Sequence, residues 1–190
     1  MERKEFLKRA GLGSVVLALF PALAGPAWAH GDGDDDRRDF FFQALSGQAA
    51  TLTGGESIVM SGCGSFREGG GIKGGGEFVH FDGRHIPSPA FIATGSWKAR
   101  ELLSFTEIGT WGVGVAGIAQ MAIRLQPCDG RPVDANLKVV CNIGPAGLVT
   151  NPFQQEGFTL TVPGLTTFAP FTPNVGLTFF TRSCHEEDDH

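Results

Sequence analysis

The sequence predicts an all-β fold, an antiparallel barrel of about eight strands, with a two-sheet sandwich as the alternative. The 190 residues include 28 glycines and 11 prolines, and many of the glycines separate short apolar runs. Several of these runs alternate apolar with polar residues, which is typical of sheets that have one buried and one solvent-exposed face. No run between them shows a helical period, so β-α-β units are not expected. Glycines inside the strand-like runs favour the barrel, because they let strands bend at corners.

The strand-like runs follow one another from residue 40 to residue 182, which we expect to form a single domain. The expected strands are residues 40–45, 56–63, 76–82, 96–108, 114–126, 135–143, 156–162 and 174–181. The glycine-rich stretch 69–76 is expected to be a loop, because no helix and no G-K-[ST] follows it to hold a phosphate. Asp129-Gly130 predicts a hairpin turn between the fifth and sixth strands.

The alternation within strands predicts which side chains form the core, because successive side chains point to opposite faces. Three strands give the clearest patterns. The expected inner faces are Trp97, Ala99, Leu103 and Phe105; Ala119, Met121, Ile123 and Leu125; and Leu137, Val139, Cys141 and Ile143.

Residues 1–29 have the three parts of a secretory signal: a basic start, an apolar run and an A-x-A site ending at Ala29. Arg3-Lys4-Glu5-Phe6-Leu7-Lys8 resembles the twin-arginine export motif, with Lys4 where the second arginine is usual. The resemblance implies export of a folded protein. Residues 30–39 and 183–190 are polar and predict flexible acidic tails.

Charge and hydropathy narrow the classes of partner. The chain has 15 basic and 20 acidic residues, and cleavage after Ala29 leaves 11 basic against 18 acidic. This balance argues against nucleic acid as a partner. No later segment has the length and purity of a transmembrane anchor. We therefore expect an exported protein, in the periplasm, at the cell surface or outside the cell, whose partner is a small molecule or a protein. Its oligomeric state is left open.

Four cysteines, Cys63, Cys128, Cys141 and Cys184, remain after the leader. An exported chain meets oxidising conditions, so the even number predicts up to two disulfides. Four cysteines allow three pairings, and the spacing does not choose among them.

The phrases GGGEFVHFDG and SWKARELLSF, with their short glycine-flanked strands, are similar to small secreted β-barrels. This pattern of short, glycine-flanked strands resembles the allene-oxide-cyclase-like and dirigent-like barrel families. The resemblance implies a fold and transfers no functional residue.

Glu101 is the unexpected residue of the fourth strand, because its parity places a carboxylate on the apolar face. Burial there would raise its pKa and make it a candidate acid or base, with His80 as a partner from a neighbouring strand. The alternatives are a bulge that turns Glu101 outward and a salt bridge to Arg100 or Arg124.

His30 would be the first residue after cleavage at Ala29, and its amine and ring together offer two ligands to one metal. Such a site resembles the copper-binding histidine brace of lytic polysaccharide monooxygenases, with His80 or His85 as the second histidine. The alternative is an incidental histidine in a solvated tail.

Three functions follow from these observations. The leading expectation is a binding or structural domain without a cofactor. The second is a small-molecule isomerase or cyclase whose pocket lies inside the barrel. The third is a protein that holds copper or another divalent cation.

Overall fold

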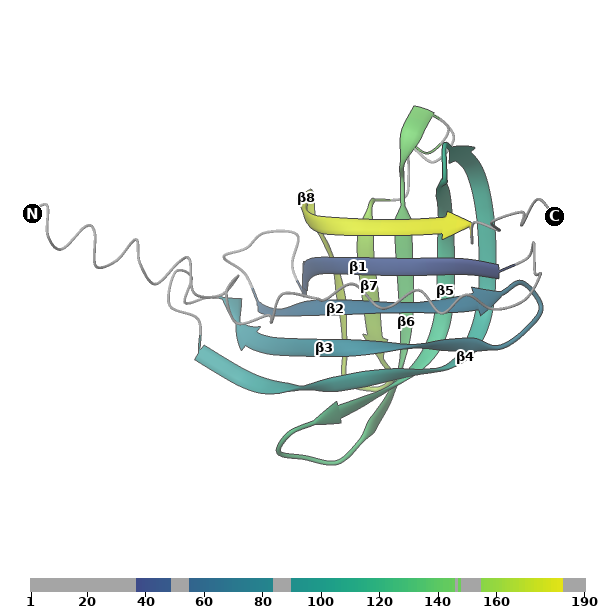
Figure 1. Cartoon of the computed structure of the whole chain (residues 1–190). Helices are drawn as coiled ribbons and strands as arrows, with labels where there is room; N and C mark the ends of the chain where they lie inside the picture. Colours follow the sequence, from purple (N-terminus) through teal and green to yellow (C-terminus); the bar gives the residue numbers. More distant parts are fainter. Residues whose placement is uncertain (1–36, 49–54, 84–89, 146, 148–154, 183–190) are drawn as a thin grey trace, which may run out of the picture. The chain divides into compact units, whose positions relative to one another are not determined.

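The computed structural model describes residues 37–48, 55–83, 90–145, 147 and 155–182. These residues form eight strands, each antiparallel to its neighbours, and the pairing of the last strand with the first closes the ring (Figure 1). The strands are β1 (Arg37–Gly47), β2 (Glu56–Arg67), β3 (Ile72–Asp82), β4 (Ala90–Trp111), β5 (Gly114–Pro127), β6 (Val133–Cys141), β7 (Gly157–Val162) and β8 (Thr166–Arg182). The predicted all-β, eight-stranded antiparallel fold is confirmed.

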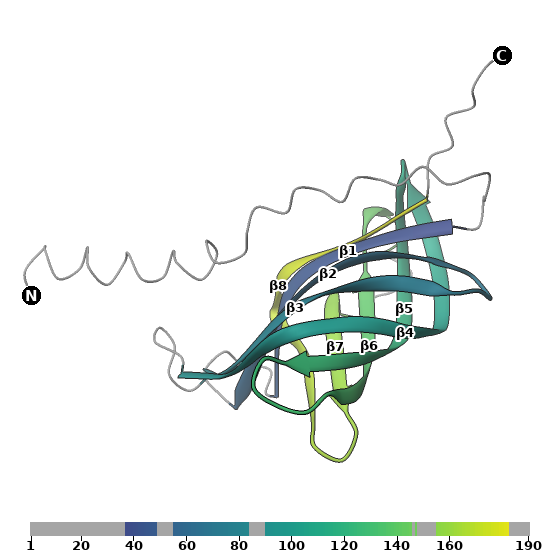
Figure 2. The ribbon, with the colours of Figure 1, turned by 60° about the horizontal axis from the view of Figure 1, so that its bottom comes forward.

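The ring has two walls rather than an even circumference. Strands β1, β2 and β3 run side by side and cross the direction of β5, β6 and β7 (Figures 1 and 2). Strand β4 joins the walls, because residues 90–98 pair with β3 and residues 95–111 pair with β5. A closed ring of this form explains why the sequence pattern suited both a barrel and a sandwich.

Several predicted boundaries need correction: β4 and β8 begin earlier than expected, at Ala90 and Thr166, and β6 ends at Cys141. Two segments that were expected to be tail or loop also belong to strands. Residues 37–39 were expected in a flexible tail, but they begin β1: all three pair with β2, and Arg38 and Asp39 also pair with β8. The expected loop 69–76 is shorter, because β3 already begins at Ile72 and Gly74 to Gly76 pair with β2. Ladder hydrogen bonds from two neighbouring strands hold these polar and glycine-rich segments extended where local sequence alone predicted a loop. The hairpin at Asp129-Gly130 is confirmed by the antiparallel pairing of β5 with β6.

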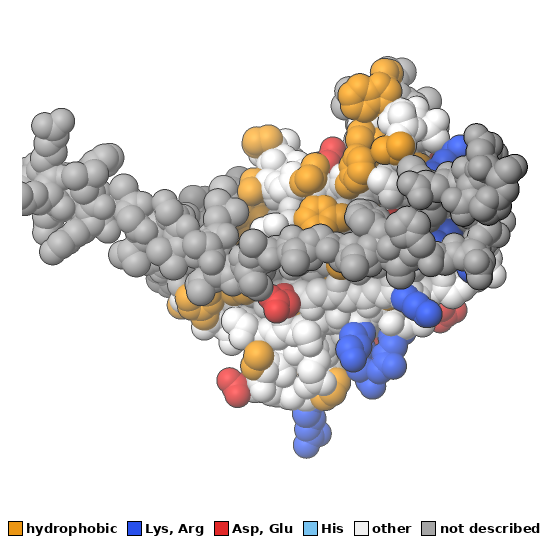
Figure 3. All heavy atoms as spheres, viewed as in Figure 1, with side chains coloured by type: hydrophobic (Ala, Val, Ile, Leu, Met, Phe, Trp, Pro, Cys, Tyr) orange, Lys and Arg blue, Asp and Glu red, His pale blue; other side chains and the backbone are white. Residues whose placement is uncertain are grey.

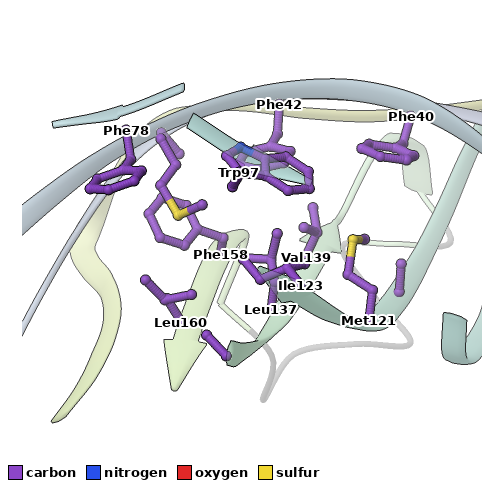
Figure 4. Close-up of a cluster of buried hydrophobic side chains, with 14 of the residues drawn as sticks. Phe40, Phe42, Phe78, Trp97, Met121, Ile123, Leu137, Val139, Phe158 and Leu160 are labelled. Atoms are coloured by element: carbon purple, nitrogen blue, oxygen red, sulfur yellow. The ribbon is translucent and has the colours of Figure 1, made fainter. Parts of the chain in front are cut away.

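Side chains fill the interior between the two walls. Phe40, Phe42, Phe78 and Trp97 lie opposite Ile123, Leu137, Phe158 and Leu160 in the close-up of Figure 4. The indole of Trp97 is 1% exposed, its ring centroid lies 5.8 Å from that of Phe42, and its Nε1–H donates to the Ser61 carbonyl at 2.8 Å. This part of the barrel is a packed core.

Glycines on the inner face of the strands make room for these aromatic rings. A Cβ atom at Gly62 would lie 2.1 Å from Cζ2 of Trp97. A Cβ atom at Gly74 would lie 2.7 Å from Cζ of Phe40. Neither glycine has a positive φ, so the space and not the backbone conformation requires glycine there. The glycine-rich phrase of β3 therefore matches large rings on the facing strands.

Irregular pairing in β4 changes which of its side chains point inward. The register to β5 shifts between Ala99 and Glu101 and again between Leu102 and Ser104. The first shift turns Leu102 toward the core, and the second restores the predicted parity at Phe105. Leu103 was expected in the core, but its side chain is 49% exposed because two bulges interrupt the alternation. The inner faces predicted for β5 and β6 are otherwise confirmed at Met121, Ile123, Leu125 and their neighbours.

Strand β8 bulges where it turns from one wall to the other. Leu45 pairs with Val175 while the next residue, Ser46, pairs with Pro170, so residues 171–174 bulge out of the ladder and include a cis Thr172–Pro173 peptide. Two buried hydroxyls bond across the interior near this bulge. Ser46 Oγ donates to the Phe158 carbonyl of β7, and Thr178 Oγ1 donates to the Val140 carbonyl of β6, both at 2.6 Å. These bonds tie the β1–β8 side of the ring to the β6–β7 side.

None of the described residues forms a helix of the length and apolarity needed to cross a membrane. Three predicted segments lie outside the described residues: the leader 1–29, residues 30–36 of the N-terminal tail and the C-terminal tail 183–190.

Candidate functional site

Polar side chains gather at one end of the barrel, where β1 and β3 end and β2 and β8 begin. Glu56 opens β2 directly opposite Asp82, the last residue of β3, and His80 lies two residues earlier on β3, opposite Ile58. The main-chain N–H of Gln48 donates to the Glu56 carbonyl at 3.0 Å, so the residue that follows β1 is held beside the start of β2. We call this end of the barrel the histidine end.

A hydrogen-bonded network joins four side chains from four strand ends, and we call it the rim cluster: Gln48, Glu56, His80 and Thr166. His80 Nε2 lies 2.9 Å from Glu56 Oε2. The amide Nε2 of Gln48 donates to the same carboxylate oxygen at 3.1 Å and to Thr166 Oγ1 at 2.9 Å. The main-chain N–H of Glu56 donates back to Gln48 Oε1 at 3.4 Å. Gln48 is thus fully used in fixing the positions of the other members.

The rim cluster lies at the boundary between the core and the solvent. The His80 side chain is 20% exposed and that of Glu56 is 40% exposed. Beneath the imidazole lies Phe168, whose ring is 2% exposed and meets the His80 ring edge to face at 5.2 Å between centroids. The aromatic contact and the carboxylate together fix the plane of the imidazole.

The hydrogen bonds leave defined positions for a ligand. A carboxylate only accepts, so the Nε2–H of neutral His80 donates to Glu56 and the lone pair of Nδ1 becomes the acceptor. No residue of the described part of the chain bonds to Nδ1. Thr166 Oγ1 accepts from Gln48, so its own hydroxyl proton remains available to donate. The rim cluster therefore offers a nitrogen acceptor, a carboxylate oxygen and a hydroxyl donor in a partly exposed position.

Glu101, the predicted partner of His80, does not belong to this site. It lies on β4 opposite Ala122, directly after the register shift at Ala99, and its side chain is exposed. The predicted inward position is wrong because the bulge reverses the parity at this residue, which was the alternative considered from the sequence. The carboxylate that contacts His80 is that of Glu56 and not that of Glu101.

The predicted metal ligands are only partly described. His80 lies in the rim cluster, whereas His30 and His85 lie outside the described residues. Within the described ranges, no group of three or more His, Cys, Asp or Glu side chains is placed to hold a metal ion. One ring N–H of His80 does donate to a carboxylate, as is common for histidines that bind a metal through the other ring nitrogen.

The three described cysteines, Cys63, Cys128 and Cys141, are all unpaired, and Cys184 lies outside the described residues. The disulfides that the sequence predicted, up to two, are therefore not found among these three cysteines. Cys141 pairs with Gly117 near the start of β5, whereas Cys128 follows the last residue of the same strand. A strand of that length separates them by about 35 Å at roughly 3.3 Å per residue. Cys141 is also buried in the core, where no partner from the surface reaches it.

Burial governs the chemistry of Cys141. Loss of solvent raises the pKa of its thiol above 9.0, and hydrogen bonds from the main chain at Ile143 and Phe180 offset only part of this effect. The thiol therefore stays protonated at neutral pH and behaves as a small apolar group. Cys141 is a core residue and not a nucleophile.

Sequence reasoning found His80 but missed Gln48, Glu56 and Thr166. Each lies at a strand end beside a glycine-containing or polar stretch, where its residue type carries no signal. Their common feature is proximity in a closed ring, which joins residue 48 to residue 166. Only a knowledge of the strand order would have indicated the cluster.

Comparison of the chain with family models, with curated proteins and with solved structures found no match in any of the three.

Proposed function

We propose that this protein is an exported binding protein that takes a small molecule at the rim cluster of the histidine end. The network around His80 is the observation that supports it. Four strand ends contribute to one set of hydrogen bonds. Among the described residues, this set leaves the lone pair of His80 Nδ1 and the hydroxyl proton of Thr166 available to a ligand. Because Trp97 is 1% exposed within the packed core, a ligand of the rim cluster would stay at the rim and not enter the middle of the barrel.

The hydrogen-bonding groups that remain available indicate which class of ligand the rim cluster binds. A ring nitrogen acceptor beside a carboxylate favours a group that donates hydrogen bonds, such as a hydroxyl or an ammonium group. Phe168 supports the imidazole from beneath and is 2% exposed, so the ligand meets His80 and not Phe168. A small alcohol, phenol or amine supplies such a donor, whereas an anion would meet the Glu56 carboxylate.

Histidine ring resonances in an NMR titration test this proposal. Ethanolamine, phenol, glucose and Zn²⁺ are titrated one at a time into the protein while the His80 ring signals are followed. We expect a saturable shift at His80 with at least one of the organic probes, and loss of that shift in Glu56→Gln. Glu77→Gln serves as the matched control, because Glu77 is an exposed carboxylate on β3 outside the cluster. A shift that survives Glu56→Gln unchanged would refute binding at the rim cluster.

The 2.9 Å contact of His80 with Glu56 also favours a second candidate, an isomerase or cyclase in which His80 removes a proton. A histidine held by a carboxylate is a common general base. In this version the base lies at the rim and not inside the barrel. Deuterium uptake at the carbon next to the carbonyl of acetoin in D₂O measures such proton removal. Uptake that is faster than in buffer and is lost in His80→Gln would favour this candidate over simple binding.

A metal-binding role remains the third candidate, with His80 as its described ligand. Zn²⁺ in the same titration tests it, because a metal bound at Nδ1 broadens or shifts the His80 ring signals in a way that excess chelator reverses.

A further inference from the structure

The outer face of β1 and β8 carries apolar side chains although it points away from the core. Phe40 and Phe42 of β1 point into the core (Figure 4), so the two-residue alternation turns their neighbours outward. The pairing of β1 with β8 places these neighbours directly opposite outward-facing residues of β8. The pairs are Phe41 with Phe179, Gln43 with Leu177 and Leu45 with Val175. We call the five apolar members of these pairs the outer apolar face: Phe41, Leu45, Val175, Leu177 and Phe179.

The outer apolar face is accessible and free of charge. Leu177 is 54% exposed and Val175 is 41% exposed, whereas the two phenylalanines and Leu45 are half-buried. No charged residue occurs in β8 before Arg182 or in β1 after Asp39. The outer side of an antiparallel sheet is usually polar. A contiguous apolar surface in that position is typical of a contact with another molecule.

The apolar surface continues from β8 toward the β4–β5 turn. A Cβ atom at Gly114 would lie 3.5 Å from Cε2 of Phe179 and 3.0 Å from Cδ1 of Ile143, so both side chains border the main chain at this glycine. Gly144 lies against Trp111, which is 62% exposed. Figure 3 shows hydrophobic side chains gathered over the upper part of the barrel, where Figure 1 places β8 and the ends of β4 and β6.

The size of this surface fits the apolar centre of a dimer interface. The exposed fractions of Trp111, Leu177 and Val175 correspond to about 300 Å² of apolar surface, and the half-buried members add about 100–200 Å² more. A stable interface buries roughly 800 Å² on each partner, of which about 56–65% is apolar. The surface therefore supplies most of the apolar area that one partner of such an interface needs.

Gln43 indicates that the partner is a second copy of this chain. It is half-buried in the middle of the outer apolar face, between Phe41 and Leu45 on β1 and opposite Leu177. Its amide has no hydrogen-bond partner within the part of the chain that the structure describes. A carboxamide both donates and accepts, so two of them related by a two-fold axis pair through two reciprocal hydrogen bonds. Lipid chains on this face would leave the amide without a hydrogen bond, which is unfavourable.

We propose that two copies of this chain associate through the outer apolar face, with Gln43 close to the two-fold axis. Two sheets that pack face to face lie about 10 Å apart, with their strands within about 30° of each other. The contact is isologous, so the face of one copy buries the same face of the other. This dimer does not depend on the ligand proposed for the rim cluster.

Sedimentation equilibrium of the full chain at about 1–200 µM tests the proposal. We expect a monomer–dimer equilibrium with a Kd in the micromolar range, because the interface is at the small end of the usual sizes. Leu177→Asp places a charge on the face and should weaken association at least a hundredfold. Leu165→Asp is the matched control, because Leu165 is 77% exposed in the β7–β8 turn outside the face. This control should leave the Kd unchanged.

Two substitutions at Gln43 test its place near the axis. Gln43→Glu brings two carboxylates together and should weaken association at least tenfold. It also decides the matter if the urea midpoint of Leu177→Asp shows that this variant unfolds. Gln43→Cys, in a chain whose Cys63, Cys128 and Cys184 are replaced by serine, should form a disulfide-linked dimer on oxidation. Ser96→Cys in the same background should not, because Ser96 is exposed on β4 away from the face.

Several results would overturn the proposal. One is a chain that stays monomeric at about 200 µM. Another is a dimer that neither Leu177→Asp nor Gln43→Glu weakens, or that Leu165→Asp weakens equally, since the contact would then lie elsewhere. A monomeric chain that sediments with phosphatidylcholine vesicles, and loses this property in Leu177→Asp, would assign the face to a membrane instead.

Discussion

Replacing Gly62 by alanine should destabilise the barrel by about 1–5 kcal/mol, because the new methyl group has no space. Its Cβ would lie 2.1 Å from Cζ2 of Trp97, whereas carbon atoms in contact need about 3.5–4.0 Å. The indole is 1% exposed, packs on Phe42 and donates to the Ser61 carbonyl, so moving it by more than an ångström breaks a buried hydrogen bond. Overpacking of this kind costs about 1–3 kcal/mol, and loss of the buried bond about 1–3 kcal/mol more. The reduced freedom of the unfolded chain returns about 0.4–1 kcal/mol.

Urea unfolding followed by far-UV circular dichroism measures this cost. Gly71→Ala is the matched control, because a Cβ atom there meets no atom within 4 Å and the residue has no positive φ. Its effect should stay within about 0.5 kcal/mol. The double variant Gly62→Ala/Trp97→Phe should lose at least about 1 kcal/mol less than the sum of the two single variants, because the smaller ring removes the collision. Equal midpoints for Gly62→Ala and Gly71→Ala would show that the inner glycines do not serve to seat aromatic rings.

Four further outcomes follow from buried and paired groups. Thr178→Val, which keeps the shape but removes the donor of a 2.6 Å bond, should cost about 1–3 kcal/mol in a urea melt, and a neutral result would contradict the role of this hydroxyl. Cys128, which is exposed, should react with a thiol reagent at pH 8 in the folded protein, whereas buried Cys141 should react only after unfolding. Because burial raises the pKa of the Cys141 thiol above 9.0, the folded state holds this proton more tightly than the unfolded chain, so its contribution to stability should be complete below pH 9 and decline above it. Glu56→Gln should change the His80 ring from one dominant tautomer, protonated at Nε2, to a mixture visible in long-range ¹H–¹⁵N spectra, and an unchanged spectrum would mean that Glu56 does not orient the ring.

Local patterns were sufficient wherever strands pair regularly. The alternation in β5 predicted that Met121 and Ile123 face the core, and the structure has both fully buried. The same reasoning failed in β4, where it placed Leu103 inside and Glu101 beside it. Two register shifts opposite β5 accommodate extra residues in the longer strand. A bulge depends on the partner strand, so the parity of β4 alone does not reveal it.

The candidate site shows the same division. His80 was identified from its residue type, but its partner was expected to be Glu101 and is Glu56. The pairing of β2 with β3 brings Glu56 beside His80, and the closure of the ring brings Thr166 to Gln48 across more than a hundred residues of chain. Contacts of this separation depend on strand order, which composition and periodicity do not contain.

The amino-acid sequence by itself determined the all-β class, the antiparallel strands and most of the side chains that face the core, because these follow from a two-residue period and from where glycine interrupts it. Only the tertiary structure decided that glycines 62 and 74 accommodate aromatic rings, that the carboxylate at 56 holds the imidazole, and that apolar side chains of β1 and β8 meet on the outer face. The physical reason is that strand pairing and packing bring together side chains that are far apart in the chain, and each of these features is a contact between different strands.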